Sequence, residues 1–138
     1  SELVKKLCAE FQTTDTCAVH VRGGDIVGPG RAFFERALAR MEKEHPGLRY
    51  LVFTNDKEAA KEALEGEHTE RKMTYISELG AFSDIDEFFL MAACRHQIIS
   101  NSSYSTWAAY LNPNPEKVVI MPEYKGCEQI RLKEWIVL

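Results

Sequence analysis

Apolar and polar positions divide the 138-residue chain into two alternating kinds of segment. Short apolar runs, typical of buried strands, occur at 17–22, 49–54, 72–76, 97–99 and 117–121. Apolar residues recur at the three- and four-residue spacing of a helix over 2–11, 31–44, 57–64, 84–94 and 103–111. Strands that alternate with helices predict an α/β fold, with a doubly wound, mostly parallel sheet of about five strands and helices on both faces.

The length of the chain supports one domain with its own core. We expect a leading helix and linker at 1–16, a motif-bearing core at 17–125 and an apolar tail at 126–138 that packs back on the body. No apolar run is long enough to span a bilayer, and no signal peptide opens the chain. These features predict a cytoplasmic protein without a membrane span.

The formal net charge of −4 argues against a nucleic-acid partner. Any bound anion must therefore be held by a local site. The four cysteines have no CxxC spacing, and Cys17 and Cys94 lie in apolar segments. We expect these two to be buried thiols in a reducing compartment.

Polar clusters follow three of the predicted strands, at 22–25, 54–56 and 100–105. Ligands of doubly wound sheets bind outside the carboxyl ends of the strands. Because the carboxyl ends of parallel strands meet at one edge of a sheet, the three clusters are expected to converge there. The sequence therefore predicts one ligand site built from distant parts of the chain.

The cluster after the fourth strand reads Ser-Asn-Ser-Ser at 100–103 and leads into a predicted helix. Ser and Asn are preferred helix N-caps. Free N–H groups, hydroxyls and the positive end of the helix dipole would then meet at one point, which suits a phosphate. The alternative is that these serines only cap the helix.

Arg22 is expected to be the last residue of the first strand, followed by Gly23 and Gly24. Two glycines at this point allow the backbone to approach a ligand closely. An arginine offers a fixed fork of donors that matches a phosphate. The alternative is a structural ion pair of Arg22 with Asp25 or Asp56.

His20 lies two residues before Arg22, so both share one face of the strand. A lone strand histidine is more often a hydrogen-bonded core residue than a functional one. Asp86 and Glu87 open a predicted helix, where acidic residues usually complement the dipole. Asp56 is likewise a candidate N-cap.

Other common site motifs are missing from the sequence. GxGxxG does not fit the glycines at 23–30, and no Gly-Lys-Ser/Thr follows to make a P-loop. No cluster of His and Cys has metal-ligand spacing, and no Ser/His/Asp triad is indicated. The sequence therefore predicts no metal site.

Several segments together resemble one family, the α-1,2-fucosyltransferases of glycosyltransferase family 11. The specific motifs are HxRxGD, here VHVRGGD at 19–25, and IISNSSYSTWAAYLN at 98–112. Supporting segments are FTND at 53–56, EFFLM at 87–91, KVVIMP at 117–122 and WI at 135–136. The resemblance covers residues 17–138.

The resemblance implies a GDP-fucose donor and an inverting transfer to the 2-hydroxyl of a galactoside, without a metal. The implied partners are thus a nucleotide-sugar donor and a glycan acceptor. The implied fold is two-lobed and GT-B-like, and this chain would form the second, Rossmann-like lobe that binds the donor.

The resemblance also implies roles at the phosphate side of a donor site. Arg22 would be the catalytic residue, because it would hold the β-phosphate and stabilise the departing GDP. Ser102, Ser103 and the amides near Tyr104 and Ser105 would cradle the pyrophosphate.

The nucleoside side of that site is implied as well. His20 would lie beside the nucleoside, and Glu87 would accept two parallel hydrogen bonds from guanine, with Asp86 as the fallback. Asp56 would orient Arg22 or contact the nucleotide. Gly23 and Gly24 would supply the loop next to the ligand.

Two departures from the family pattern change the expectation. The family usually has a second arginine where this chain has Gly23, so weaker binding or an altered rate is expected. The family's N-terminal half, which helps form the acceptor site, is absent from the sequence, so transfer is expected to be weak or lost. The exposed face left by that half would favour self-association.

Two other functions stay open. One is a non-catalytic nucleotide-binding or structural domain that kept the fold. The other is an unrelated doubly wound domain for another phosphorylated ligand, which a preference between guanine and adenine nucleotides would distinguish.

Overall fold

The computed structural model describes residues 1–23, 28–66 and 71–138. The helices are α1 (Glu2–Thr13), α2 (Arg31–Glu44), α3 (Lys57–Leu64), α4 (Asp84–Ala93) and α5 (Ser103–Leu111), with 3-10 helices η1 (Ile76–Glu78) and η2 (Cys127–Gln129). The strands are β1 (Thr16–Val21), β2 (Arg49–Thr54), β3 (Lys72–Tyr75), β4 (His96–Ile98), β5 (Val119–Met121) and β6 (Ile136–Val137).

The strands form one parallel sheet of six in the described residues, in the order β3-β2-β1-β4-β5-β6. This is the order of the Rossmann fold, and it reverses direction between β1 and β4. The predicted α/β class and doubly wound sheet are thus confirmed. The predicted number of about five strands is one too low, because the tail at 126–138 contributes β6. A two-residue strand is too short to give a periodic pattern in the sequence.

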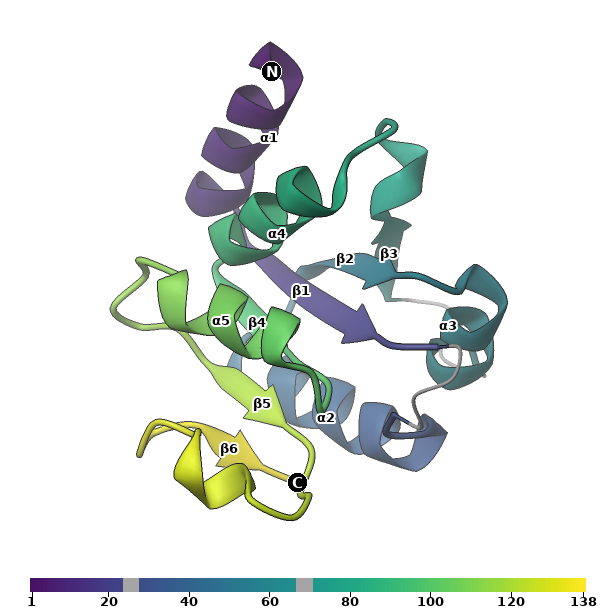
Figure 1. The fold of residues 1–138 in the computed structure, drawn as a ribbon, viewed down its shortest axis with the longest axis vertical. Coiled ribbons are helices and arrows are strands. Elements are labelled where there is room, and N and C mark those ends of the chain that lie inside the picture. The colour runs from purple at the N-terminus through teal and green to yellow at the C-terminus, as the bar shows by residue number, and fades with distance from the viewer. Residues whose placement is uncertain (24–27, 67–70) are drawn as a thin grey trace.

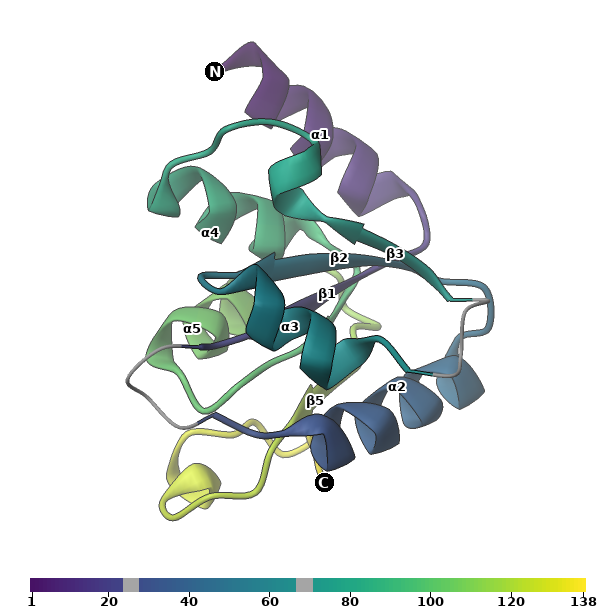
Figure 2. The same ribbon diagram turned by 90° about the vertical axis from the view of Figure 1, so that its right-hand side faces the viewer.

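Helices cover both faces of the sheet (Figures 1 and 2). One core cluster joins the sheet to α2 and α3 and includes the fully buried Phe34 and Leu38. A second cluster lies between the sheet and α1, α4 and α5, and includes Phe11 and Leu90. A third, around Trp135, packs the C-terminal segment onto β5. Both faces of β1 are therefore covered, and all six of its residues are buried.

Several predicted boundaries shift by one or two residues. β1 ends at Val21, which pairs with the last residue of β2, so Arg22 follows the strand instead of closing it. α1 continues to Thr13, whose hydroxyl donates to the carbonyl of Ala9 at 2.8 Å. η1 begins at Ile76 and shortens β3. By contrast, the bounds of α2, β2, α3 and α5 match the predicted ranges.

β5 begins at Val119, two residues later than predicted, because the backbone N–H of Lys117 donates to the Asn114 carbonyl and that of Val118 donates to His96 Nδ1. The side chain of Lys117 fixes the end of α5 instead. Its ammonium group donates to the carbonyls of Ala109, Tyr110 and Asn112, at 2.7, 3.4 and 3.2 Å. These carbonyls lie at the C-terminal end of α5, where a cation complements the helix dipole. Lys117 thus helps to fix the helix whose other end faces the candidate site.

The two helical layers differ in their outer surfaces. Among the described residues, the large apolar side chains that are exposed on helices all belong to the layer of α1, α4 and α5, and are Leu3, Ile85, Phe89, Trp107 and Leu111. In the same residues, no helix is both long and apolar enough to cross a membrane. All four cysteines are free, and Cys17 and Cys94 are buried as predicted.

Replacing Lys117 by methionine should test the tie between this lysine and α5. Lys117→Met keeps the length of the side chain and removes the cation. Unfolding free energy, measured by chemical denaturation, should fall by about 1–2 kcal/mol because three carbonyls lose their donor. Lys125→Met, at an exposed lysine, is the control and should change stability by less than about 0.5 kcal/mol. Equal effects of the two variants would refute the role of Lys117.

Candidate functional site

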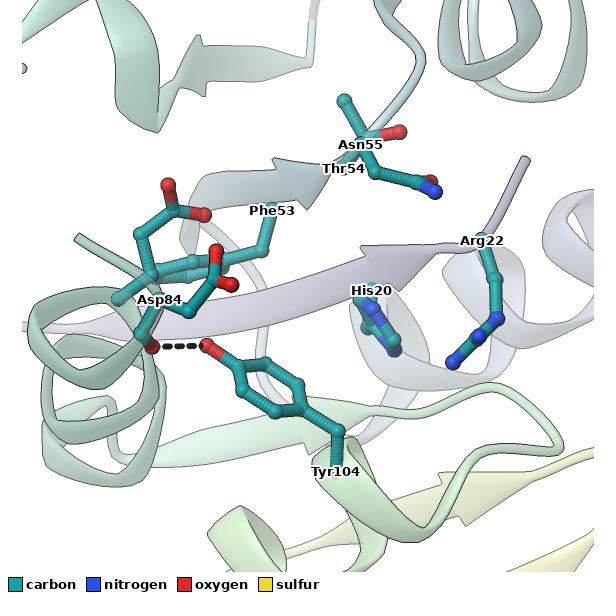
Figure 3. A pocket seen from close by; sticks show the side chains of 8 residues that line it. His20, Arg22, Phe53, Thr54, Asn55, Asp84 and Tyr104 are labelled. Atoms are coloured by element: carbon teal, nitrogen blue, oxygen red, sulfur yellow. Dashed lines mark hydrogen bonds between the residues drawn. The ribbon is translucent and has the colours of Figure 1, made fainter. Parts of the chain in front are cut away.

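A pocket of about 320 Å³ opens at the carboxyl ends of β1 and β2 and against the first turns of α4 and α5. Its lining residues are His20, Arg22, Phe53, Thr54, Asn55, Asp84, Glu87 and Tyr104. His20 and Arg22 lie next to each other at the end of β1, and Tyr104 reaches across to Asp84 (Figure 3). The pocket therefore lies beside the point where the strand order reverses, as expected for this fold.

Arg22 directly follows β1, and the pairing of β1 with β2 and β4 fixes its position. Its Nη1 donates to Ser102 Oγ at 3.4 Å, so the guanidinium connects the end of β1 to the start of α5. Its Nε is buried and has no hydrogen-bond partner among the described residues. No ion pair joins Arg22 to Asp56 in those residues, and Asp25 lies outside them. A buried donor without an acceptor is costly, so the guanidinium is suited to binding an anion.

The serine-rich turn after β4 caps α5 and contacts Arg22, although its serines are not among the lining residues of the pocket. Ser102 is the N-cap, and its Oγ accepts from the backbone N–H of Tyr104 at 3.2 Å. Ser103 is exposed at the first position of the helix. The hydroxyl of Ser105 is buried beneath the turn, where it accepts from the N–H of Ser100 at 3.3 Å. The hydroxyl of Ser105 thus supports the turn from inside, and the predicted phosphate contact at this residue is through its backbone amide.

His20 is both a buried, hydrogen-bonded residue and a lining residue of the pocket. The residue is 8% exposed, and its Nδ1 lies 2.8 Å from Ser100 Oγ. Its ring centroid is 5.7 Å from that of Tyr104. Burial, and secondly the positive charge of Arg22, lower the pKa of His20 to about 4. The imidazole is therefore neutral at physiological pH.

Gly23 is held against the turn that follows β2. Its N–H donates to Asn55 Oδ1 at 2.8 Å, and Asn55 Nδ2 donates back to the Gly23 carbonyl at 3.3 Å. A Cβ at this position would lie 2.5 Å from the Cβ of Asp56. Asp56 caps α3, with its Oδ1 accepting from the N–H of Ala59 at 3.1 Å. Its predicted alternative role as an N-cap is confirmed, and the predicted Gly24 lies outside the described residues.

The acidic residues of α4 divide between capping and the pocket. Asp86 forms a capping box with Ser83, and the distance from Ser83 N to Asp86 Oδ2 is 3.4 Å. Glu87 lines the pocket, and burial, followed by the charge of Asp84, raises its pKa. The Asp84 carbonyl accepts from the Tyr104 hydroxyl at 2.6 Å. Glu87 is therefore better placed than Asp86 to contact a ligand.

Sequence reasoning did not select Asp84 or Asn55 as site residues. Asp84 is the first residue of α4, and only the packing of α4 against α5 brings it to the pocket. Asn55 belongs to the predicted cluster at 54–56. Its amide forms two hydrogen bonds with the backbone of Gly23, beyond the ends of both strands, and no local pattern in the sequence indicates this pairing.

The pocket has two chemically different ends. Arg22 and the N-terminus of α5 provide donors and positive charge, whereas Asp84 and Glu87 provide acceptors. Within the described residues, no group of three or more His, Cys, Asp and Glu side chains gathers to hold a metal ion. The arrangement suits a ligand with an anionic group at one end and several donors at the other.

A doubly wound α/β domain with a polar pocket at its switch point belongs to the class of nucleotide- and cofactor-binding folds. The sequence model described as Glycosyl transferase family 11 matches residues 3–138, so the chain belongs to glycosyltransferase family 11. The chain is also similar to the O-antigen biosynthesis glycosyltransferase WbnK of Escherichia coli, with 29% identity over 130 residues. That match covers 86% of this chain and 40% of WbnK, so the chain spans less than half of this relative.

Gly23→Ala should disturb the turn that borders Arg22. The new Cβ would collide with Asp56, and we expect a loss of about 1–3 kcal/mol in unfolding free energy, as for other overpacked sites. The control is Gly30→Ala, at a glycine with nothing within 4 Å of an added Cβ. Thermal or chemical denaturation measures both. A harmless Gly23→Ala would show that the turn yields easily and is not built around the glycine.

Stability should fall as the pH decreases from about 6.5 towards 4. The pKa of both His20 and His96 is lowered to about 4, mainly by burial, whereas an unfolded chain binds protons near 6.5. The neutral forms therefore stabilise the fold fully above about pH 6.5, and this contribution is lost on acidification. Denaturation curves of His20→Gln and His96→Gln should each show a shallower decline than the parent chain. If the unfolding free energies of the parent chain and both variants fell equally with decreasing pH, the lowered pKa values would be contradicted.

Proposed function

We propose that this chain binds GDP-fucose as the donor-binding part of an α-1,2-fucosyltransferase, with transfer directed to the 2-hydroxyl of a galactoside. Membership of glycosyltransferase family 11 and the similarity to WbnK support the transferase class. The single observation that most favours the proposal is the guanidinium of Arg22, whose buried Nε has no hydrogen-bond partner among the described residues and whose Nη1 donates to the N-cap of α5.

The pyrophosphate is proposed to lie between Arg22 and the first turn of α5. An arginine fork matches two phosphate oxygens, and the helix N-terminus adds unpaired N–H groups and a positive dipole. Ser103 is exposed at this turn, so its hydroxyl and backbone amide are accessible to a phosphate. Ser102 contributes by fixing Arg22 and the start of the helix together.

The nucleoside is proposed to lie towards α4. Glu87 is a carboxylate in the pocket, and guanine presents two parallel donors, N1–H and N2–H₂, which a carboxylate accepts well. Adenine offers no such pair at that edge. His20 and Tyr104 line the space between Glu87 and Arg22, so they would contact the nucleoside.

Arg22 would act in the transfer step itself. As the bond from fucose C1 to the β-phosphate oxygen breaks, GDP leaves with the electron pair and gains negative charge. A guanidinium fixed next to that oxygen stabilises the charge more in the transition state than in the bound donor. No described residue is assigned to the acceptor.

A second candidate function is a non-catalytic nucleotide-binding or structural domain that kept the fold. The observation that favours it is Gly23, which stands where the family usually has a second arginine. The close approach of Asp56 to this glycine indicates a site with one guanidinium where the family usually has two.

Calorimetric titration of the chain with GDP, with ADP and fucose as controls, tests the proposal. GDP should bind selectively. Arg22→Ala should weaken binding by about 10- to 100-fold, since hydrogen bonds to charged groups are worth roughly 1.5–3 kcal/mol, and Ser103→Ala by only about 2- to 10-fold. Glu87→Gln should reduce the preference for GDP over ADP.

Three results would count against this assignment. If Arg22→Ala bound GDP like the parent chain, the phosphate would not lie at Arg22. Equal binding of ADP and GDP would refute the guanine site and favour another phosphorylated ligand. No binding at millimolar GDP would favour the second candidate function.

A further inference from the structure

Ser100 contacts the imidazole of His20 from the side that faces away from the pocket. Ser100 is completely buried, and its Oγ lies 2.8 Å from His20 Nδ1. The Nε2 atom, on the other edge of the ring, makes no hydrogen bond to any described residue. Because the ring lines the pocket, Nε2 is the polar ring atom available to a ligand.

The neighbours of Ser100 decide which way its hydroxyl proton points. The other oxygen near Ser100 Oγ is Ser105 Oγ, at the longer distance of 3.4 Å. Ser105 Oγ already accepts from the backbone N–H of Ser100. The hydroxyl of Ser105 has its own acceptors, namely Ser100 Oγ and the carbonyl of Ser102. His20 Nδ1, at the shorter distance, is thus the best acceptor for the hydroxyl proton of Ser100.

We infer that Ser100 is a positioning residue that donates to His20 Nδ1 and thereby holds the imidazole as the Nε2–H tautomer, with an N–H donor facing the pocket. A neutral histidine carries its proton on one nitrogen only, and the hydrogen bond at the other nitrogen selects which. The ligand atom that this donor meets must be an acceptor. An adjoining phosphate, ribose or base oxygen fits that requirement.

A second histidine in the same chain supplies an internal standard. His96 Nδ1 accepts from the backbone N–H of Val118 at 2.9 Å. A backbone amide only donates, so neutral His96 must have its proton on Nε2. Both histidines have a pKa lowered to about 4, which keeps them neutral together at pH 7. His20 is therefore expected to have the same tautomer as His96, selected by a hydroxyl instead of an amide.

Long-range ¹H–¹⁵N spectra of the histidine-labelled chain at pH 7 test the tautomer directly. Both His20 and His96 should give the pattern of an unprotonated Nδ1 and a protonated Nε2. In Ser100→Ala, His20 should change to a mixture of tautomers while His96 stays unchanged, which also shows that the fold is intact. The control is Thr106→Val, which removes a buried hydroxyl from the same turn that bonds to the Ser102 carbonyl and does not contact His20. This control should leave the His20 signal as it is.

GDP titration then tests whether the ligand uses the donor, and this step rests on the proposed function. Ser100→Ala should weaken the binding of GDP by about 2- to 10-fold, which corresponds to the loss of one neutral hydrogen bond. In a His20→Ala background the same substitution should cost nothing further, because the two residues act through one contact.

The possible results separate the two ideas. A protonated Nδ1 on His20 in the parent chain, or no spectral change in Ser100→Ala, would overturn the positioning role. Additive losses of GDP affinity in the double variant would also overturn it. The expected spectra without GDP binding to the parent chain would keep the positioning role and refute the proposed function.

Discussion

The parallel pairing of β1 with both β2 and β4 is the constraint on which the site depends. Val19 pairs with Val52 on one side and with Ile98 on the other. This double register brings the ends of three strands to one level, so that residues about 30 and 80 positions apart along the chain, Arg22, Asn55 and Ser102, come together. β1 can hold this central place because all of its side chains are buried between two helical layers.

At the carboxyl ends of the strands, some polar groups have structural roles, and others are available to a ligand. The carboxylates of Asp56 and Asp86 cap their own helices, and the hydroxyl of Ser105 supports the turn from inside. The Arg22 guanidinium makes only one long hydrogen bond within the described residues, to Ser102, and its buried Nε has no acceptor there. The Glu87 carboxyl makes no hydrogen bond to those residues, and burial raises its pKa. These two side chains, more than the serine-rich turn, distinguish a binding site from a well-capped sheet edge.

The sequence predicted those parts of the molecule that depend on local patterns. The bounds of α3 and α5 were found because Asp56 and Ser102 are good N-caps. β6 was missed because its two residues gain their place by pairing with β5, which no local pattern records. Asp84 was missed for a similar reason, since only the packing of α4 against α5 turns a first-turn acid into a pocket residue. Long-range contact, and not propensity, decided each of these cases.

The charge at the site follows from how the chain folds around Gly23. With Asp56 packed so closely, position 23 has room for a backbone and not for a side chain. In the proposed donor complex, one guanidinium would balance the phosphate charge that the family usually meets with two. In that complex, part of the work would pass to neutral donors, namely the amides at the start of α5 and an uncharged His20, whose low pKa is itself partly due to Arg22. Such neutral donors form weaker hydrogen bonds to a phosphate than a second cation would.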